Sequence, residues 1–259
     1  MKLHTETTGC GPGLVVLHGW GLHSGIWTAL LPALTRHFRV TCIDLPGHGY
    51  SDAPTAMFGL EDAAEAAAQA APRGATWLGW SLGGQVALAV ALAGADVHRL
   101  VLVATTPRFV AAPDWPCGMA AETLAGFAAS LAEDHRRTVR NFLTLQLRGD
   151  RRAVPLLSML RAVLAQRGDP RPAALAAGLD ILATTDLRNR LAALRQHTLV
   201  IAGERDRLVP AEAGRRLAAG VPNGRFVPFP GAAHAPFLTH PRSFVEAVTG
   251  FARNDEAVA

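Results

Sequence analysis

The chain has 259 residues, of which 49% are hydrophobic and 18% are charged. That is enough to bury one sizeable core, so we expect a single domain over residues 1–259. The formal net charge is +4, but there is one tyrosine and no basic run interleaved with aromatic residues, which argues against a nucleic-acid-binding protein.

Three features of the sequence indicate the cellular compartment. Met1 to Glu6 lack the layout of a signal peptide. No apolar stretch approaches the roughly 18 residues needed to span a bilayer. Cys10, Cys42 and Cys117 are an odd number without motif spacing, so we expect free thiols in a reducing environment. These features predict a cytoplasmic protein without membrane contact, and we expect a monomer.

Short apolar runs predict the strands of a sheet. They lie around 14–17, 40–44, 76–80, 100–104, 198–202 and 226–229. Helical segments such as 60–71 separate them. The runs are apolar throughout rather than alternating, as expected for parallel strands buried on both faces. We therefore predict an α/β fold with a mostly parallel central sheet flanked by helices.

The stretch from about 110 to 190 interrupts this rhythm. It contains helix-like sequence and no convincing strand. It lies between the fourth and fifth predicted strands. We interpret it as an inserted helical cap subdomain above an active site.

A candidate nucleophile follows the third predicted strand. Gly79-Trp80-Ser81-Leu82-Gly83 has the pattern G-x-S-x-G between a strand and a small, apolar helix-like stretch. This strand-turn-helix context is typical of a nucleophile elbow, where a sharp turn lifts the serine hydroxyl clear of the sheet. Its neighbours must be small so that strand and helix can approach. Ser81 is the predicted nucleophile.

The catalytic base should follow the serine in the chain. His234 lies in a loop between the last predicted strand and a C-terminal helix, and we predict that it is the base. His240 directly precedes Pro241, a favoured first helical residue, and is better explained by a helix start. The remaining histidines either precede Ser81 or lie in solvated settings: His4, His18, His23, His37, His48, His98, His135 and His197.

The orienting acid should follow the strand at 198–202. Asp206 lies in the loop Gly203 to Pro210, where a carboxylate can reach the imidazole and fix its tautomer. The G-x-x-D-x-x-V-P spacing favours Asp206 over Glu204, which we interpret as a solvated charge. Asp44 precedes the serine and is expected to brace the turn that follows it.

An oxyanion hole needs two N–H donors. One should be the N–H of Leu82, the residue after the nucleophile. The other should come from the loop after the first predicted strand, where His18-Gly19 allows a tight turn and the Trp20 N–H can face the serine. We expect His18 to pack under this loop. No pair of residues has metal-ligand spacing, so we expect no metal and no cofactor.

Positive charge is concentrated in the predicted cap. Residues 132–171 contain nine arginines and four acidic residues, an excess of +5. The rest of the chain is close to neutral in sum. We interpret this as a functional basic face, although arginine-rich composition contributes to it.

Segments spread along the chain match the pattern of one enzyme family. They are Leu17 to Leu22 with Trp27, Asp44 to Gly49, Trp77 to Gly84, Arg137 to Val139, Phe142 to Gln146, Gly178 to Leu182, Asp186 to Arg188, Ala233 to Phe237 and His240-Pro241. Together they resemble the BioH-type pimeloyl-acyl carrier protein methyl ester esterases of biotin synthesis, a family of α/β-hydrolases. The resemblance covers nearly the whole chain, and the cap matches are the most specific because caps vary more freely than the catalytic frame.

The resemblance implies a serine carboxylesterase that removes the methyl group from a pimeloyl chain borne by acyl carrier protein, its partner. It implies substrate contacts at Trp20, Ser81, Leu82, Phe142, Leu143, Thr144, Leu145, Gln146 and His234. Arg137 matches a carrier-facing arginine of the family. Local charge adds Arg140, Arg148, Arg151 and Arg152 to the candidate docking surface.

Three alternatives use the same frame. A general short-chain carboxylesterase or a C–C bond hydrolase would share the three candidate catalytic residues. An acyltransferase would pass the Ser81 acyl group to an acceptor other than water. A non-catalytic binding protein on a hydrolase frame is disfavoured by the intact Ser-Asp-His order, and a dehalogenase would have aspartate at position 81.

Overall fold

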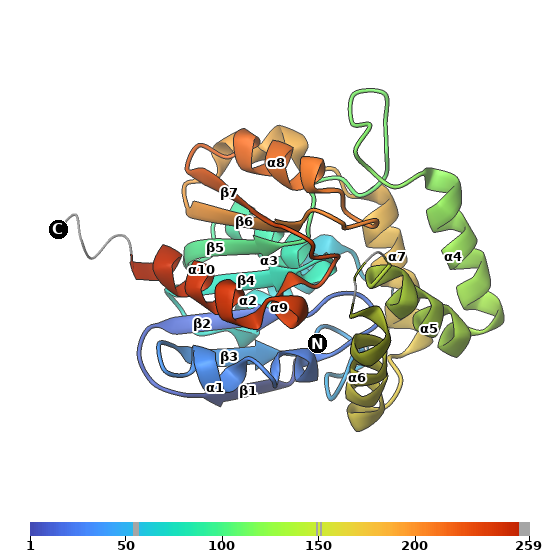
Figure 1. Ribbon diagram of the computed structural model, residues 1–259, viewed down its shortest axis with the longest axis horizontal. Helices are drawn as coiled ribbons and strands as arrows, with labels where there is room; N and C mark the ends of the chain where they lie inside the picture. The colour runs from blue at the N-terminus through green and yellow to red at the C-terminus, as the bar shows by residue number, and fades with distance from the viewer. Residues whose placement is uncertain (54–56, 149, 151, 254–259) are drawn as a thin grey trace.

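The computed structural model describes residues 1–53, 57–148, 150 and 152–253. A seven-stranded sheet runs through the molecule in the order β1-β3-β2-β4-β5-β6-β7 (Figure 1). Only β1 is antiparallel to its neighbour. The strands are β1 Thr5–Thr8, β2 Gly13–Leu17, β3 Arg39–Ile43, β4 Ala75–Trp80, β5 Val97–Val103, β6 His197–Gly203 and β7 Gly224–Phe229. The predicted α/β class, with a mostly parallel sheet, is confirmed.

The six predicted strands are β2 to β7, and β1 is the strand that the sequence analysis missed. All four residues of β1 are exposed, and its sequence Thr-Glu-Thr-Thr has no apolar residue. An edge strand of this kind gives no hydrophobic signal. By contrast, every residue of β4 is buried, because helices cover both faces of the sheet at its centre.

Helices cover the two faces of the sheet. On one face, α2 (Leu60–Ala70) contacts α3 (Leu82–Leu92), and α8 (Ala211–Gly220) packs on β6 and β7. On the other face, α1 (Leu31–Leu34) contacts α10 (Pro241–Arg253), which follows the short α9 (Pro236–Thr239). The 3-10 helices η1 (Ser24–Trp27) and η2 (Arg188–Ala193) lie in the connecting segments.

A helical segment joins β5 to β6. It contains α4 (Ala121–Glu133), α5 (His135–Gln146), α6 (Ala153–Arg167) and α7 (Pro172–Thr184). These helices lie together at the carboxyl ends of the strands, at the right of Figure 1. Asp134 caps α5 by accepting the Arg137 N–H at 2.9 Å, and Pro172 begins α7.

The strand order reverses between β2 and β4. The chain passes from β2 outward to β3 and then returns to β4 on the other side of β2. In open α/β sheets, such a switch point leaves a crevice beyond the carboxyl ends of the two strands. The loop after β2 and the turn after β4 meet there. None of the helices within the described ranges has the length and apolarity needed to cross a bilayer.

Candidate active site

Ser81 occupies a strained turn between β4 and α3. Its backbone has φ 55° and ψ −120°, a conformation that non-glycine residues rarely adopt. The Ser81 N–H donates to the Val103 carbonyl at 2.9 Å, and the Thr105 hydroxyl donates to the Ser81 carbonyl at 2.7 Å. A Cβ on Gly79 would overlap the Gly83 carbonyl, and one on Gly83 would overlap the His18 carbonyl. The motif's glycines therefore permit the close approach of strand, helix and loop.

His234 lies between Ser81 and Asp206. Its Nε2 is 3.0 Å from Ser81 Oγ, and its Nδ1 is 2.7 Å from Asp206 Oδ2. The other Asp206 oxygen accepts the N–H groups of Leu208 and Val209 at 2.8 and 3.0 Å. An Nδ1–H that donates to Asp206 leaves the Nε2 lone pair free to accept the serine hydroxyl. The arrangement can therefore withdraw the Ser81 proton.

The competing candidates lie outside this relay. Glu204 is exposed, whereas Asp206 is buried. His240 contacts the Thr239 hydroxyl at 2.8 Å and lies beside the ring of Phe229. The structure thus brings together the three residues that the sequence analysis selected.

The backbone N–H groups of the two predicted oxyanion-hole residues are available to a ligand. Across the described ranges, neither the Trp20 N–H nor the Leu82 N–H has a hydrogen-bond partner. Gly19 packs against the elbow, because a Cβ placed on it would lie 3.2 Å from Ser81 Cβ. Leu82 is the first residue of α3, where the helix dipole favours negative charge. Together these groups can stabilise an oxyanion formed at Ser81.

The helical segment contributes contacts from α5 and α7. The Phe142 ring lies 4.8 Å from the Trp20 ring, and the Gln146 carbonyl accepts the His234 N–H at 3.2 Å. The Trp20 indole donates to the Leu175 carbonyl at 2.9 Å. Leu143 is buried and Leu145 is half-buried, whereas Thr144 is exposed and donates to the Arg140 carbonyl. Phe142 and Gln146 are thus the members of the predicted substrate segment with direct contacts to the site.

The sequence profile described as alpha/beta hydrolase fold matches residues 12–241. The chain belongs to the α/β-hydrolase family. It is 45% identical to the pimeloyl-[acyl-carrier protein] methyl ester esterase of Nitrosomonas europaea, over 94% of this chain and 97% of that protein. It is 45% identical to the protein of the same name in Yersinia enterocolitica, over 94% and 95%. The chain therefore also belongs to this narrower family of esterases.

Solved structures agree with the family. A hydrolase from Pseudomonas aeruginosa PA01 has a TM-score of 0.80 at 32% identity and covers 96% of this chain and 94% of its own. An esterase from Exiguobacterium antarcticum has a TM-score of 0.87 at 23% identity, over 97% and 95%, which supports the fold alone.

Trp80 is a site residue that the sequence analysis of this α/β-hydrolase did not single out. Its indole donates to the His234 carbonyl at 2.8 Å, and its ring lies 5.6 Å from the imidazole. Since Gln146 accepts the His234 N–H, the backbone of this residue is held on both sides. The position of Trp80 inside the elbow motif was the available signal, but a contact over 154 positions in sequence cannot be read from the motif.

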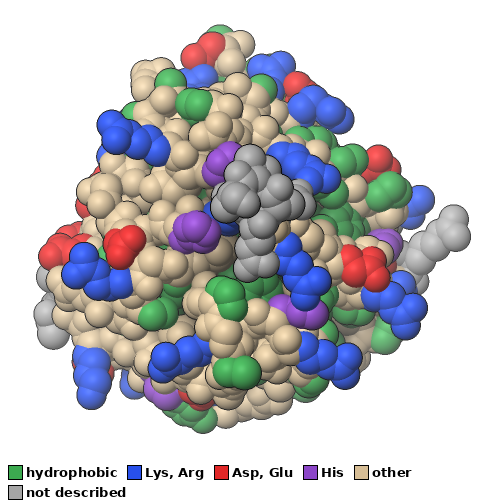
Figure 2. Space-filling view, turned by 90° about the vertical axis from the view of Figure 1, so that its left-hand side faces the viewer, with side chains coloured by type: hydrophobic (Ala, Val, Ile, Leu, Met, Phe, Trp, Pro, Cys, Tyr) green, Lys and Arg blue, Asp and Glu red, His purple; other side chains and the backbone are tan. Residues whose placement is uncertain are grey.

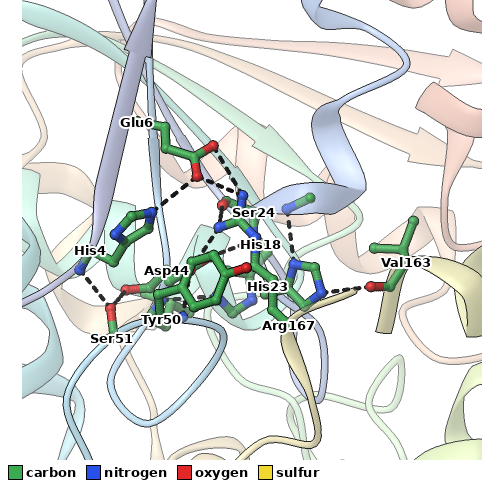
Figure 3. Close-up of polar contacts among 12 residues, drawn as sticks. His4, Glu6, His18, His23, Ser24, Asp44, Tyr50, Ser51, Val163 and Arg167 are labelled. Carbon is green, nitrogen blue, oxygen red and sulfur yellow. Dashed lines mark hydrogen bonds and ion pairs between the residues drawn. The ribbon is translucent and has the colours of Figure 1, made fainter. Parts of the chain in front are cut away.

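A second group that the sequence analysis missed is centred on Arg167, the last residue of α6 (Figure 3). Its guanidinium contacts both Glu6 oxygens at 2.9 and 3.0 Å and Asp44 Oδ2 at 2.9 Å. It also donates to Ser24 Oγ and lies over the Tyr50 ring, 4.8 Å from its centroid. This cluster joins the helical segment to β1 and to the loops after β2 and β3.

Asp44 is the buried acceptor of this cluster. Its carboxylate accepts the Ser24 N–H at 2.7 Å and the Tyr50 N–H at 2.9 Å, so it braces the following turn as expected. Burial opposes its charged form, but the neighbouring His18 and these N–H donors outweigh burial and lower the pKa of Asp44 to about 2. Asp44 is therefore a charged structural group.

The buried histidines near this cluster have backbone partners. Within the part of the chain that the structure describes, no group of three or more His, Cys, Asp or Glu residues is placed to hold a metal ion. The buried His18, His23 and His48 instead make hydrogen bonds with the backbone.

Proposed function

We propose that this enzyme hydrolyses the methyl ester of pimeloyl-[acyl-carrier protein] to the free carboxylate and methanol, in biotin synthesis. The relay from Ser81 through His234 to Asp206 carries the proposal, because it supplies the groups that serine ester hydrolysis requires. The names of the relatives supply the substrate.

The mechanism follows from the placement of these groups. Ser81 Oγ attacks the ester carbonyl while His234 Nε2 takes its proton, and Asp206 orients the imidazole. The N–H groups of Trp20 and Leu82 stabilise the tetrahedral oxyanion. As the tetrahedral intermediate collapses, the bond from the carbonyl carbon to the methoxy oxygen breaks, and His234 gives its proton to that oxygen so that methanol leaves. Water, activated by the same imidazole, hydrolyses the acyl-enzyme and regenerates Ser81, so the cycle needs no cofactor.

The helical segment at about 110–190 acts as a cap over this site. The substrate surface would comprise Trp20, Ser81, Leu82, His234 and the segment Phe142, Leu143, Thr144, Leu145 and Gln146. The buried Phe142 and Leu143 suit the methylene chain of a pimeloyl group, because apolar contact is favourable there. Thr144 remains in this proposed surface from the family resemblance alone, because its side chain is exposed and donates to the Arg140 carbonyl.

Carrier docking is assigned to arginines of the cap. Arg137, Arg140, Arg148 and Arg152 are exposed, whereas Arg151 lies outside the described residues. Arg137 forms an ion pair with Glu133 at 3.5 Å, and Arg136 forms one with Asp169 at 2.6 Å. Both acids are already subtracted in the excess of +5, so that excess is carried by the other arginines of the cap. An acidic carrier would therefore bind mainly to Arg140, Arg148 and Arg152, where acidic side chains of this chain compete least for the guanidinium groups.

Exposed arginines also lie outside the cap. The sum outside the cap is close to neutral, yet Figure 2 shows Lys and Arg side chains spread over the face turned away from α4. Exposed Arg39, Arg195 and Arg225 lie at the amino ends of β3, β6 and β7. These three exposed arginines offer a control for tests of docking.

The compartment and assembly complete the proposal. Cys10, Cys42 and Cys117 are all free thiols, which supports a reducing cytoplasm. We assign a monomer, which light scattering after gel filtration tests directly. A dimer would contradict that assignment without affecting the assigned reaction.

The decisive test compares substrates. The purified enzyme should release methanol from carrier-bound pimeloyl methyl ester with a kcat/KM at least about 100-fold above that for short-chain esters. Expression should also restore growth of a biotin auxotroph that lacks its methyl ester esterase. Equal kcat/KM for both substrates, together with failed rescue, would indicate a general carboxylesterase.

A further inference from the structure

His18 is a buried imidazole that the mechanism above does not use. It follows β2 directly, and none of its surface is exposed. The ring makes two hydrogen bonds with backbone groups: Nδ1 lies 2.8 Å from the Gly19 carbonyl, and Nε2 lies 2.9 Å from the Leu45 N–H. Both ring nitrogens therefore have a hydrogen-bond partner, one in the loop after β2 and the other in the loop after β3.

These partners determine the tautomer. A backbone N–H only donates, so Nε2 must accept the hydrogen bond from Leu45 through its lone pair. The one ring proton is then on Nδ1 and points at the Gly19 carbonyl. Burial, assisted by the neighbouring charge of His48, lowers the pKa of His18 to about 3. The ring keeps this neutral form at physiological pH.

The Gly19 carbonyl and the Trp20 N–H belong to one peptide group. The group is planar, and no cis peptide occurs within the described ranges, so the two bonds point in opposite directions. A hydrogen bond that fixes the carbonyl therefore fixes the direction of the N–H. The Leu22 N–H also donates to the Gly19 carbonyl. At 3.4 Å this hydrogen bond is longer and weaker than the one from His18.

We propose that His18 is a positioning residue of the oxyanion hole, which holds the Gly19–Trp20 peptide so that the Trp20 N–H faces Ser81. The packing of Gly19 against Ser81 places this peptide beside the nucleophile. The inference rests on the proposed serine esterase mechanism but not on the identity of the acyl group. It is therefore tested with p-nitrophenyl acetate, so that a wrong physiological substrate leaves it intact.

Two substitutions separate the two hydrogen bonds. In His18→Asn, the side-chain amide N–H lies near the position of Nδ1 and can still donate to Gly19. In His18→Gln, the amide oxygen lies near the position of Nε2 and can still accept from Leu45, but the bond to Gly19 is lost. Each variant loses one buried hydrogen bond, so their thermal stabilities should fall by similar amounts.

Catalysis should distinguish the variants. Removing an oxyanion donor lowers kcat by about 10²–10³-fold. A donor that is only misdirected should cause a smaller decrease. His18→Gln should therefore lower kcat by about 10- to 100-fold with little change in KM. Its affinity for phenylboronic acid, which forms a tetrahedral adduct with the serine, should fall by a similar factor. His18→Asn should stay within about threefold of wild type, a rescue by the variant that keeps the Gly19 bond. Equal kcat for the two variants, or losses that follow melting temperature alone, would overturn the proposal.

A measurement on the unsubstituted enzyme avoids any folding defect. The ¹⁵N chemical shifts of the His18 ring should report a protonated Nδ1 and an unprotonated Nε2 from pH 5 to pH 9. A proton on Nε2 would remove the donor to Gly19 and refute the assignment, even if neither variant folds.

Discussion

Removing Arg167 from its ion pair with Asp44 should destabilise the folded state strongly. The Asp44 side chain is 0% exposed and that of Arg167 is 11% exposed. Removing one partner of a buried pair costs about 3–5 kcal/mol, because the other charge stays buried. In Arg167→Met, Asp44 keeps the Ser24 and Tyr50 N–H donors. We therefore expect the lower end of that range, about 3 kcal/mol.

For a chain of this size, about 3 kcal/mol corresponds to a fall in melting temperature of about 6–12 °C. Urea unfolding followed by circular dichroism measures the free energy directly. Arg136→Met is the matched control, since Arg136 is also a cap arginine with a carboxylate partner, but its side chain is 66% exposed. It should cost less than about 1 kcal/mol. Equal losses in the two variants would refute the role assigned to burial.

The buried Asp44 carboxylate also predicts a pH dependence. The pKa of Asp44 is lowered from 3.8 to about 2, so its charged form stabilises the folded state above about pH 4, and this contribution is lost as the pH falls toward 2. The stability difference between wild type and Arg167→Met should therefore shrink below about pH 4. A difference that stays constant down to pH 2 would mean that the Asp44 charge is not involved.

Three further predictions concern catalysis and docking. Ser81→Ala and His234→Ala should each lower ester turnover by about 10⁴–10⁶, and the double variant should be little worse, because the triad acts as a unit; more than about a tenth of wild-type turnover in pure Ser81→Ala would exclude Ser81 as nucleophile. Trp20→Phe keeps the backbone N–H but loses the hydrogen bond to Leu175, so kcat should fall by less than about tenfold; a well-folded but inactive variant would make the indole itself essential. Replacing Arg140, Arg148 and Arg152 with Glu should lower kcat/KM for the carrier-bound ester by at least about tenfold at low salt, with recovery as salt is raised and no change for a small ester. The control replaces Arg39, Arg195 and Arg225 with Glu, which changes the net charge by the same amount on the opposite face. An equal loss of kcat/KM in this control would show that net charge, not a docking surface, is responsible.

The sequence predicted most where local chemistry decides structure. Six strands, the elbow at Ser81 and the order Ser81, Asp206, His234 follow from apolar runs and from turns that only certain residues permit. The edge strand β1 was missed because its exposed residues have no apolar pattern.

Contacts between distant segments left no local signal. Arg167 reaches Asp44 across 123 positions in sequence, and Trp80 reaches His234 across 154. His18 was correctly placed under its loop, but its hydrogen bonds depend on the position of Leu45 after β3. Such roles require knowledge of which strand ends are neighbours, and the sheet order supplies it.

Two hydrogen bonds link the cap to groups of the site. Gln146 accepts from the backbone of His234, and Leu175 accepts from the indole of Trp20. A cap that lifted away from the sheet would release the base and the oxyanion loop together. If the proposed cap opens to admit substrate, admission and assembly of the catalyst would be thermodynamically linked, because the free energy that favours cap closure would also favour an ordered site. Substitutions that loosen the cap to admit bulkier esters should therefore carry a cost in turnover, and selection for a wider entrance would need compensating contacts at these two carbonyls.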